Sequence, residues 1–155
     1  IRYMAKGCDC KWVFVDHLSL IISGRDDGNE RKAIDILMTK LRSLCHEAKI
    51  GMLLACHLRR LDNDKGHEEG KQVSLSHLRG SHSIAQLSDA VIGMERNQQD
   101  DDEIAKNTST IRVLKNRYAG TTGIGSYLLY STENGRMTEI DNPFKENADE
   151  FDTQE

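Results

Sequence analysis

Four absences narrow the classes of protein to which this 155-residue sequence can belong. No apolar run approaches the roughly 20 residues that cross a bilayer, and no secretory signal opens the chain, so we expect neither a membrane span nor export. The four cysteines form no C-x-x-C pair, which disfavours a zinc knuckle or a disulfide framework. The sequence also lacks a phosphate loop of the form G-x-x-x-x-G-K-[ST]. Because the first residue is Ile1 rather than methionine, we expect an excised or truncated piece.

The surroundings of the cysteines favour a reducing compartment. Cys45 and Cys56 lie among apolar residues and are expected to be core thiols, so a cytosolic setting is the simplest interpretation. A metal site would have to combine the four cysteines with His46 and His57. Since their spacing matches no zinc pattern, this alternative is disfavoured.

Charge is unevenly distributed along the chain, whose net charge is −4. Residues 1–99 contain 15 Lys and Arg against 13 Asp and Glu, whereas residues 100–155 contain 6 against 12. The first part is therefore nearly neutral and the end is acidic. Binding of a polyanion would need a local basic patch, because the chain has no global positive field.

Apolar patterning predicts a strand–helix–strand unit in the first third of the chain. Residues 12–15 and 52–56 are short continuous apolar runs typical of buried strands. Between them, apolar residues from Ile34 to Ala48 recur at i, i+3, i+4 and i+7, the spacing of an amphipathic helix. Buried strands joined by a helix favour a parallel sheet covered by helices, with a right-handed crossover. We therefore predict an α/β fold.

The second half of the chain predicts further strands and an acidic tail. Residues 90–94 form a third apolar run, and a charged turn is expected at residues 100–103. Strands predicted at residues 110–114 and 127–130 are close in sequence, which favours an antiparallel hairpin. Residues 141–155 are acidic and have little to bury, so they are predicted to be a disordered tail.

Polar residues follow both buried strands of the strand–helix–strand unit. Asp16 ends the first run, and an acid at the carboxyl tip of a parallel strand can bind Mg²⁺ directly or through water. His57 follows the second run, so both side chains would emerge at one edge of the sheet, where an imidazole could contact a γ-phosphate. A loop-capping role for Asp16 and a structural role for His57 are the open alternatives.

Two basic segments could contact phosphates. Residues 59–82 combine cations with three glycines and suit a nucleic-acid backbone, although four acidic residues dilute the charge and a solvated loop is the alternative. Residues 66–72 superficially resemble a phosphate loop, but they lack Ser or Thr after Lys71 and follow no strand. Lys115 and Arg117 alternate along a strand end, where Arg117 could serve as an arginine finger or be a surface cation.

Five ordered motifs carry a resemblance to a known family. They are residues 13–18 (VFVDHL), 54–58 (LACHL), 78–89 (LRGSHSIAQLSD), 95–98 (ERNQ) and 114–120 (LKNRYAG). Together they resemble the helicase domain of the phage primase-helicase of podoviruses, which is close to the mitochondrial Twinkle and bacterial DnaB helicases. The resemblance covers about residues 1–140, and five motifs in this order are far more specific than any one of them.

This resemblance implies the C-terminal part of a RecA-like P-loop NTPase core, with a largely parallel sheet flanked by helices and a C-terminal antiparallel hairpin. Residues 1–140 would form this part of the domain. The whole protein would be a hexameric 5′→3′ DNA helicase that hydrolyses ATP, dTTP or another nucleoside triphosphate with Mg²⁺. The family's phosphate loop and catalytic glutamate would lie upstream of Ile1, so we expect residues 1–155 alone to hydrolyse ATP poorly or not at all. A cytoplasmic location, in a bacterial or phage-infected cell, is expected.

The resemblance also implies roles by position. Asp16 resembles the Walker B acid for Mg²⁺, and His57 resembles the γ-phosphate sensor that couples hydrolysis to the DNA loops. Arg117 resembles the finger offered to the nucleotide of a neighbouring subunit, with Lys115 beside it. Arg96 matches a basic position near the nucleotide.

Single-stranded DNA would be contacted through two adjacent basic loops. The DNA-binding residues that the resemblance implies are Lys65, Arg79, Gly80, Ser81 and His82. Phage relatives usually have a glycine at position 82 and a basic residue at position 85, whereas this chain has His82 and Ala85. In this loop the chain is closer to the DnaB version.

The acidic end and the function class both leave alternatives open. Residues 149–152 (DEFD) fit the acidic, aromatic-bearing tail with which phage helicases of this type dock the DNA polymerase, and a solubilising tail is the alternative.

A recombinase-like or regulatory DNA-binding ATPase without unwinding is the first rival to the helicase. A non-enzymatic module that recruits partners through its charged segments is the second.

Overall fold

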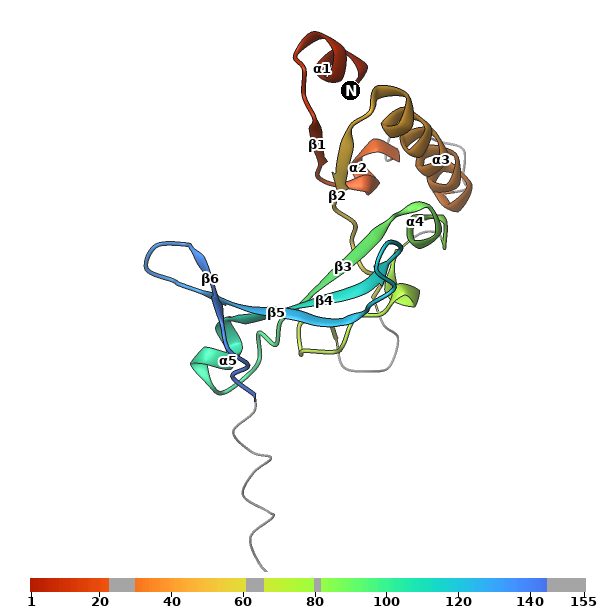
Figure 1. Cartoon of the computed structure of the whole chain (residues 1–155). Helices are drawn as coiled ribbons and strands as arrows, with labels where there is room; N and C mark the ends of the chain where they lie inside the picture. Colours follow the sequence, from red (N-terminus) through yellow and green to blue (C-terminus); the bar gives the residue numbers. More distant parts are fainter. Residues whose placement is uncertain (23–29, 61–65, 80–81, 145–155) are drawn as a thin grey trace, which may run out of the picture. The chain divides into compact units, whose positions relative to one another are not determined.

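The computed structural model describes residues 1–22, 30–60, 66–79 and 82–144. The chain divides into two compact units, each described here by itself (Figure 1). Unit 1 contains Ile1–Arg59 and Leu75–Ser88, and unit 2 contains Arg60–Ser74 and Asp89–Glu155.

Unit 1 combines helices with two short strands. Its elements are α1 (Arg2–Gly7), β1 (Trp12–Val15), α2 (Leu18–Ile22), α3 (Glu30–Ala48), β2 (Gly51–Leu54), the 3-10 turn η1 (Leu75–His77) and α4 (His82–Leu87).

Strands β1 and β2 form a parallel pair with α3 between them in the chain, which confirms the predicted strand–helix–strand unit (Figure 1). The register sets Trp12 beside Gly51 and Val15 beside Leu54. Gly51 leaves room for the indole of Trp12, because a Cβ at Gly51 would overlap the ring carbons. Parallel neighbours need a long crossover, and the 19 residues of α3 provide most of it.

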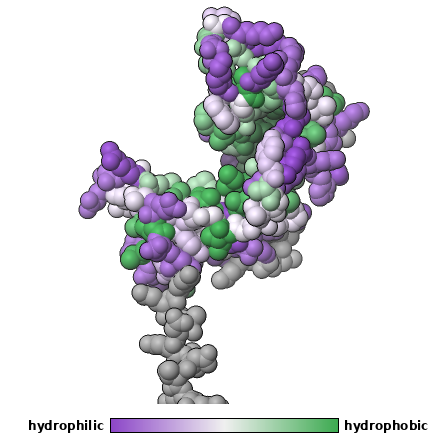
Figure 2. Space-filling model, viewed as in Figure 1, coloured by the Kyte–Doolittle hydropathy of each residue, from purple (hydrophilic) through white to green (hydrophobic). Residues whose placement is uncertain are grey.

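The long helix α3 supplies much of the core of unit 1. Its side chains at Ile34, Met38 and Leu41 are buried, and their spacing of i, i+4 and i+7 is the one predicted from the sequence. Ile34 is only 2% exposed and belongs to one apolar cluster with Leu18 of α2 and Ile84 of α4. Hydrophilic residues cover the outward side of α3 (Figure 2). The helix α3 therefore packs against β2 of the strand pair and against both α2 and α4.

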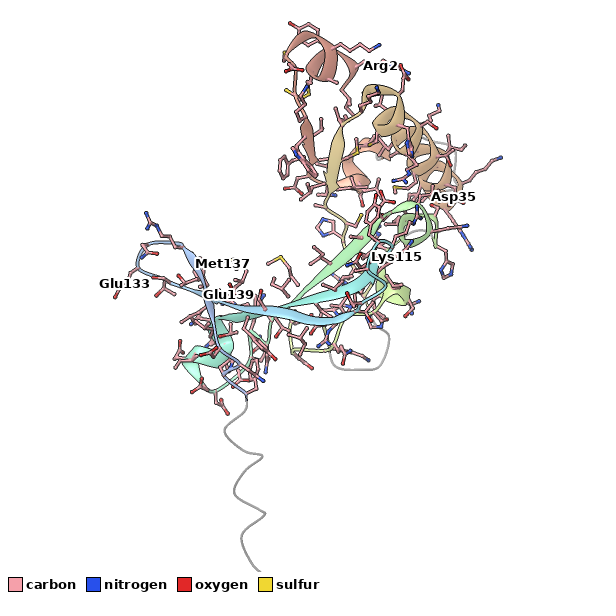
Figure 3. The ribbon with its side chains drawn as sticks, viewed as in Figure 1. Arg2, Asp35, Lys115, Glu133, Met137 and Glu139 are labelled. Atoms are coloured by element: carbon pink, nitrogen blue, oxygen red, sulfur yellow. The ribbon has the colours of Figure 1, made fainter. Side chains whose placement is uncertain are left out.

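An ion pair ties α1 to the C-terminal end of α3. Arg2 (Figure 3) donates from Nη2 to Glu47 Oε2 at 2.9 Å and from Nε to Oε1 at 3.2 Å. These hydrogen bonds lower the pKa of the Glu47 carboxyl. The contribution of the pair to stability is therefore present at neutral pH and is lost as pH falls through the lowered pKa. It is small, because both side chains are exposed.

We expect burial to decide the cost of truncating an isoleucine on α3. Ile34→Ala should lower the free energy of unfolding of the full-length protein by about 2–5 kcal/mol, because it removes apolar contacts and leaves a cavity. Ile36, on the same helix, is 40% exposed, and Ile36→Ala is the matched control with a much smaller loss. Denaturant titration measures both, and equal losses would contradict the assigned core.

Unit 2 is built on a four-stranded antiparallel sheet in the order β3-β4-β5-β6. Its elements are β3 (Ala90–Glu95), α5 (Glu103–Asn107), β4 (Thr108–Asn116), β5 (Gly123–Tyr130) and β6 (Met137–Ile140). The predicted hairpin of two late strands is confirmed as β4 and β5, and the neighbours β3 and β6 extend it. In Figure 1, the chain turns back after β5 so that β6 runs antiparallel beside it, and α5 lies beside β5.

The expectation of a largely parallel sheet is wrong for the described ranges. There the only parallel pairing is β1 with β2, and the other three strand pairs are antiparallel. The physical reason is connection length. Six residues separate β4 from β5, and six separate β5 from β6. Such connections are too short for the crossover of about a dozen residues or more that parallel neighbours need.

The predicted charged turn at residues 100–103 leads into a helix that the sequence reading missed. Asp102 is the N-cap of α5, and its Oδ1 accepts the Ala105 N–H at 2.8 Å. Glu103 in the first turn also favours the helix, since acidic groups there complement its dipole. The capping residues are present in the sequence, but a helix of five residues is too short to show the apolar periodicity by which a helix is predicted.

A buried ion pair attaches the segment before β3 to the sheet of unit 2. Glu95 is 8% exposed, and its Oε1 accepts the Arg112 Nε–H at 2.6 Å and the Val73 N–H at 2.8 Å. Arg112 Nη2 donates to the other oxygen at 2.9 Å. The hydrogen bonds to Glu95 raise the pKa of Arg112. One carboxylate therefore joins two strands and the loop around Val73.

We expect neutralising this carboxylate to destabilise unit 2. Glu95→Gln should cost about 2–3 kcal/mol, because Arg112 keeps its charge and loses a charged acceptor in a largely buried place. The matched control is Glu139→Gln on β6, where Glu139 (Figure 3) is exposed. Thermal unfolding of the full-length protein measures both; an unchanged midpoint for Glu95→Gln would contradict the assigned role of the pair.

Apolar side chains remain at the surface of both units. Trp12, Phe14 and Leu53 are exposed on β1 and β2, and Ile92 and Met94 are exposed on β3. Figure 2 shows apolar surface over the strands. Within the described ranges, no helix combines the length and the apolar character needed to cross a membrane.

Candidate functional site

The carboxyl ends of β1 and β2 bring two predicted site residues to one edge. Asp16 follows Val15, whose pairing partner in β2 is Leu54, and His57 follows Leu54 by three residues. The pairing continues past the strands, because Ala55 N–H donates to Val15 O at 2.9 Å and Leu18 N–H donates to Ala55 O at 3.0 Å. The structure therefore places Asp16 and His57 at the same edge of the strand pair, as the sequence predicted.

A third polar residue at this edge is His17, which belongs to the motif at residues 13–18 and for which the sequence predicted no role. Its ring lies against that of His57, with centroids 4.2 Å apart and planes at 71°. Within the described part of the chain, the buried Nδ1 of His17 has no hydrogen-bond partner. The peptide bond between Asp16 and His17 is cis. Proximity to Asp16 was the signal that could have marked His17.

The chemistry of this edge suits a hard cation held together with phosphates. Asp16 is exposed and presents carboxylate oxygens, which Mg²⁺ prefers as ligands. No group of three or more His, Cys, Asp or Glu that could hold a metal occurs among the residues that the structure places. Mg²⁺ is commonly bound by one or two carboxylates, water and substrate phosphates, and a single Asp16 fits that pattern.

Cys56 lies beside the edge, next to His57 in the chain. Burial raises the pKa of its thiol, because a thiolate is poorly solvated there. Cys8, in contrast, is exposed. All four cysteines are free thiols.

We expect the two cysteines to differ in alkylation by iodoacetamide. The thiolate is the reactive form, so Cys56 should react more slowly than Cys8 at neutral pH. Its rate should rise only at a higher pH than for an ordinary cysteine, because its pKa is raised. Mass spectrometry of peptides from the native full-length protein measures both rates. Faster labelling of Cys56 than of Cys8 would contradict its burial.

The predicted cations Lys115 and Arg117 lie at the end of β4, in unit 2 (Figure 3 labels Lys115). Lys115 pairs with Val91 of β3. Arg117 Nη1 donates to Asp89 Oδ1 at 3.0 Å, and the Arg117 N–H donates to Asp89 O at 2.8 Å. Asp89, at the end of a quoted motif, is a second residue whose contribution the sequence did not reveal.

Arg96, predicted to lie near the nucleotide, makes local contacts within unit 2. Its Nε donates to Lys106 O at 2.7 Å and its Nη2 donates to Asn107 Oδ1 at 3.0 Å. These bonds satisfy groups at the C-terminal end of α5, where carbonyls lack helical partners. The structure gives Arg96 a structural contact, and its contact with nucleotide stays a prediction.

The predicted DNA-binding residues are described only in part. Arg79 donates its N–H to His57 O at 3.1 Å, and its Nε lies 3.7 Å from Glu30 Oε1. His82 is exposed at the first residue of α4. Lys65, Gly80 and Ser81, and the tail from residue 145, lie outside the described residues.

The family of the chain follows from its match to a known domain. The model of the DnaB-like helicase C-terminal domain matches residues 1–139. The chain belongs to this family. The resemblance that five motifs carried is therefore confirmed, and so is the wider class of replicative helicases.

Two curated proteins are similar to this DnaB-like chain. The DNA helicase/primase of Enterobacteria phage T3 is 42% identical over 135 residues, which are 87% of this chain and 23% of that protein. The probable plasmid replicative DNA helicase of Chlamydia psittaci is 30% identical over 126 residues, 81% of this chain and 26% of that protein. The chain thus spans about a quarter of the length of these relatives.

A solved structure has the same fold. It is that of a DnaB-like replicative helicase and its interactions with primase, with a TM-score of 0.68 and 21% identity. The match covers 84% of this chain and 30% of that one. At this identity the likeness concerns the fold, and it confirms the predicted α/β, RecA-like class.

Proposed function

We propose that the full protein is a hexameric DNA helicase of replication, driven by ATP or another nucleoside triphosphate and moving 5′→3′ on single-stranded DNA. This chain would supply one side of its nucleotide site. The observation that carries the proposal is the edge at which Asp16 and His57 follow the parallel strands β1 and β2. Ligands of α/β proteins bind at the carboxyl ends of such strands.

Asp16 and His57 would act on different parts of the nucleotide. The Asp16 carboxylate would hold Mg²⁺, which neutralises charge on the phosphates when bound. His57 would contact the γ-phosphate and register its loss. The ring of His17, 4.2 Å from that of His57, would limit the orientations open to the sensor.

A backbone connection would carry the signal of His57 toward DNA. The His57 carbonyl accepts the Arg79 N–H, and two residues farther along, Arg59 N–H donates to His77 O at 2.9 Å. Leu58 and Leu78 form the bridge between them. Residues 57–59 and 77–79 are thus paired antiparallel, so a shift of the sensor would displace the segment that begins the proposed DNA loop.

Arg117 would complete the nucleotide site of a neighbouring subunit as an arginine finger. Such a finger stabilises the charge of the transferring phosphoryl group. The hexamer and the contact with single-stranded DNA belong to this proposal, as does the cytoplasmic setting. Docking of a DNA polymerase by residues 149–152 stays a prediction.

Strand displacement by the full-length protein tests the helicase. We expect unwinding of a fork with a 5′ single-stranded arm and not of one with only a 3′ arm. His57→Ala should reduce DNA-stimulated hydrolysis and unwinding by about 100-fold or more, because a group aimed at developing charge is lost. Binding of the nucleotide should remain. His46→Ala, which removes an exposed histidine of α3, is the matched control.

Each rival makes a different prediction in the same assay. DNA-dependent hydrolysis without any strand displacement would favour the recombinase-like or regulatory ATPase. Binding of DNA or protein without hydrolysis would favour the non-enzymatic module. Full unwinding by His57→Ala would leave the helicase in place and remove the sensor role.

A further inference from the structure

One residue, Asp89, holds Arg117 at two points. Its carbonyl accepts the Arg117 N–H at 2.8 Å, and its Oδ1 accepts from Arg117 Nη1 at 3.0 Å. The Asp89 side chain is 27% exposed and that of Arg117 is 43% exposed. The first bond fixes the backbone of Arg117, and the second fixes the direction of its guanidinium. The side chain remains partly exposed.

The turn that follows Arg117 is fixed independently of Asp89. Asn116 Oδ1 accepts the Tyr118 N–H at 3.2 Å and the Ala119 N–H at 3.1 Å. Gly120, whose φ of +70° suits glycine, donates its N–H to Asn116 O at 2.9 Å. Asn116 also pairs with Ala90 in the sheet. The backbone around Arg117 is therefore held by other contacts, and the Asp89 carboxylate acts mainly on the side chain.

A partly exposed ion pair contributes little to the stability of a fold. An arginine side chain, however, has many rotamers, and a donor that is oriented in advance is more effective than one that must be ordered during the reaction. An oriented guanidinium is also what electrostatic stabilisation of a transition state requires. The geometry of the pair therefore suits orientation better than stabilisation of unit 2.

We propose that Asp89 is a positioning residue for Arg117, which it orients for contact with a phosphate bound to a neighbouring subunit. The inference rests on the proposed function of Arg117 as an arginine finger. Asp89 itself would not touch the nucleotide. Removal of its carboxylate should then lower the turnover number while leaving nucleotide affinity nearly unchanged.

The test uses the full-length protein with single-stranded DNA and ATP. Asp89→Ala should lower kcat about 10- to 100-fold, the loss typical of a misplaced catalytic group, with little change in KM. Asp89→Asn keeps an acceptor for the guanidinium and should recover part of the rate. Asp101→Ala removes an exposed aspartate of the same unit and is the control, with unchanged kcat.

A double variant separates positioning from a general structural effect. Arg117→Ala should lose turnover, and adding Asp89→Ala to it should cause no further loss, because Asp89 would act only through Arg117. A further loss of the same size in the double variant, or a drop in the unfolding temperature of Asp89→Ala that Asp89→Asn fails to correct, would overturn the proposal.

The outcomes distinguish this inference from the function on which it rests. If Arg117→Ala turns over normally, the arginine finger itself is removed and the inference falls with it. If Arg117→Ala is inactive while Asp89→Ala has normal kcat, the finger stands and only the positioning role of Asp89 is overturned.

Discussion

Parallel pairing of β1 with β2 is the constraint on which the candidate site depends. Asp16 and His57 lie far apart in the chain, and each follows a strand of four residues. A two-stranded pair is marginal alone, but the α3 core cluster packs partly buried Leu54 and Cys56 against Ile34 and its neighbours. Apolar burial on one side of the pair therefore holds the polar edge at which phosphate chemistry is proposed.

Unit 2 depends on a different kind of contact, in which arginines are held by acids and carbonyls. Glu95 binds Arg112 between strands, Asp89 binds Arg117 at a strand end, and Arg96 satisfies groups at the end of α5. These three arginines carry the same charge, yet the exposure of their side chains differs: Arg112 is largely buried, whereas Arg117 is nearly half exposed. Whether one of these arginines could reach an anion therefore depends on how deeply it is buried and on which acid or carbonyl binds it, more than on its charge.

The strand–helix–strand unit and the late hairpin were predictable because they depend on local apolar spacing. The apolar spacing of α3 lies within a single segment of the chain, and so does each of the apolar runs that form β1 and β2. The short connection between β4 and β5 is likewise local. The largely parallel sheet was a wrong expectation, since it extended the pattern of the first unit to the late strands. The six-residue connections from β4 to β5 and from β5 to β6 permit only antiparallel neighbours. α5 was missed because a capped helix of five residues has too few turns to show an apolar stripe.

Residue order alone was enough to indicate the family and to propose Asp16, His57 and Arg117 as site residues, because motifs and strand ends are properties of short segments. Folding was needed to reveal the partners of these residues. His17 meets His57 across the strand pair, and Asp89 meets Arg117 over 28 positions of sequence. The orientation of a side chain depends on atoms that the fold brings near it. Contacts between residues far apart in the chain cannot be predicted from local sequence patterns.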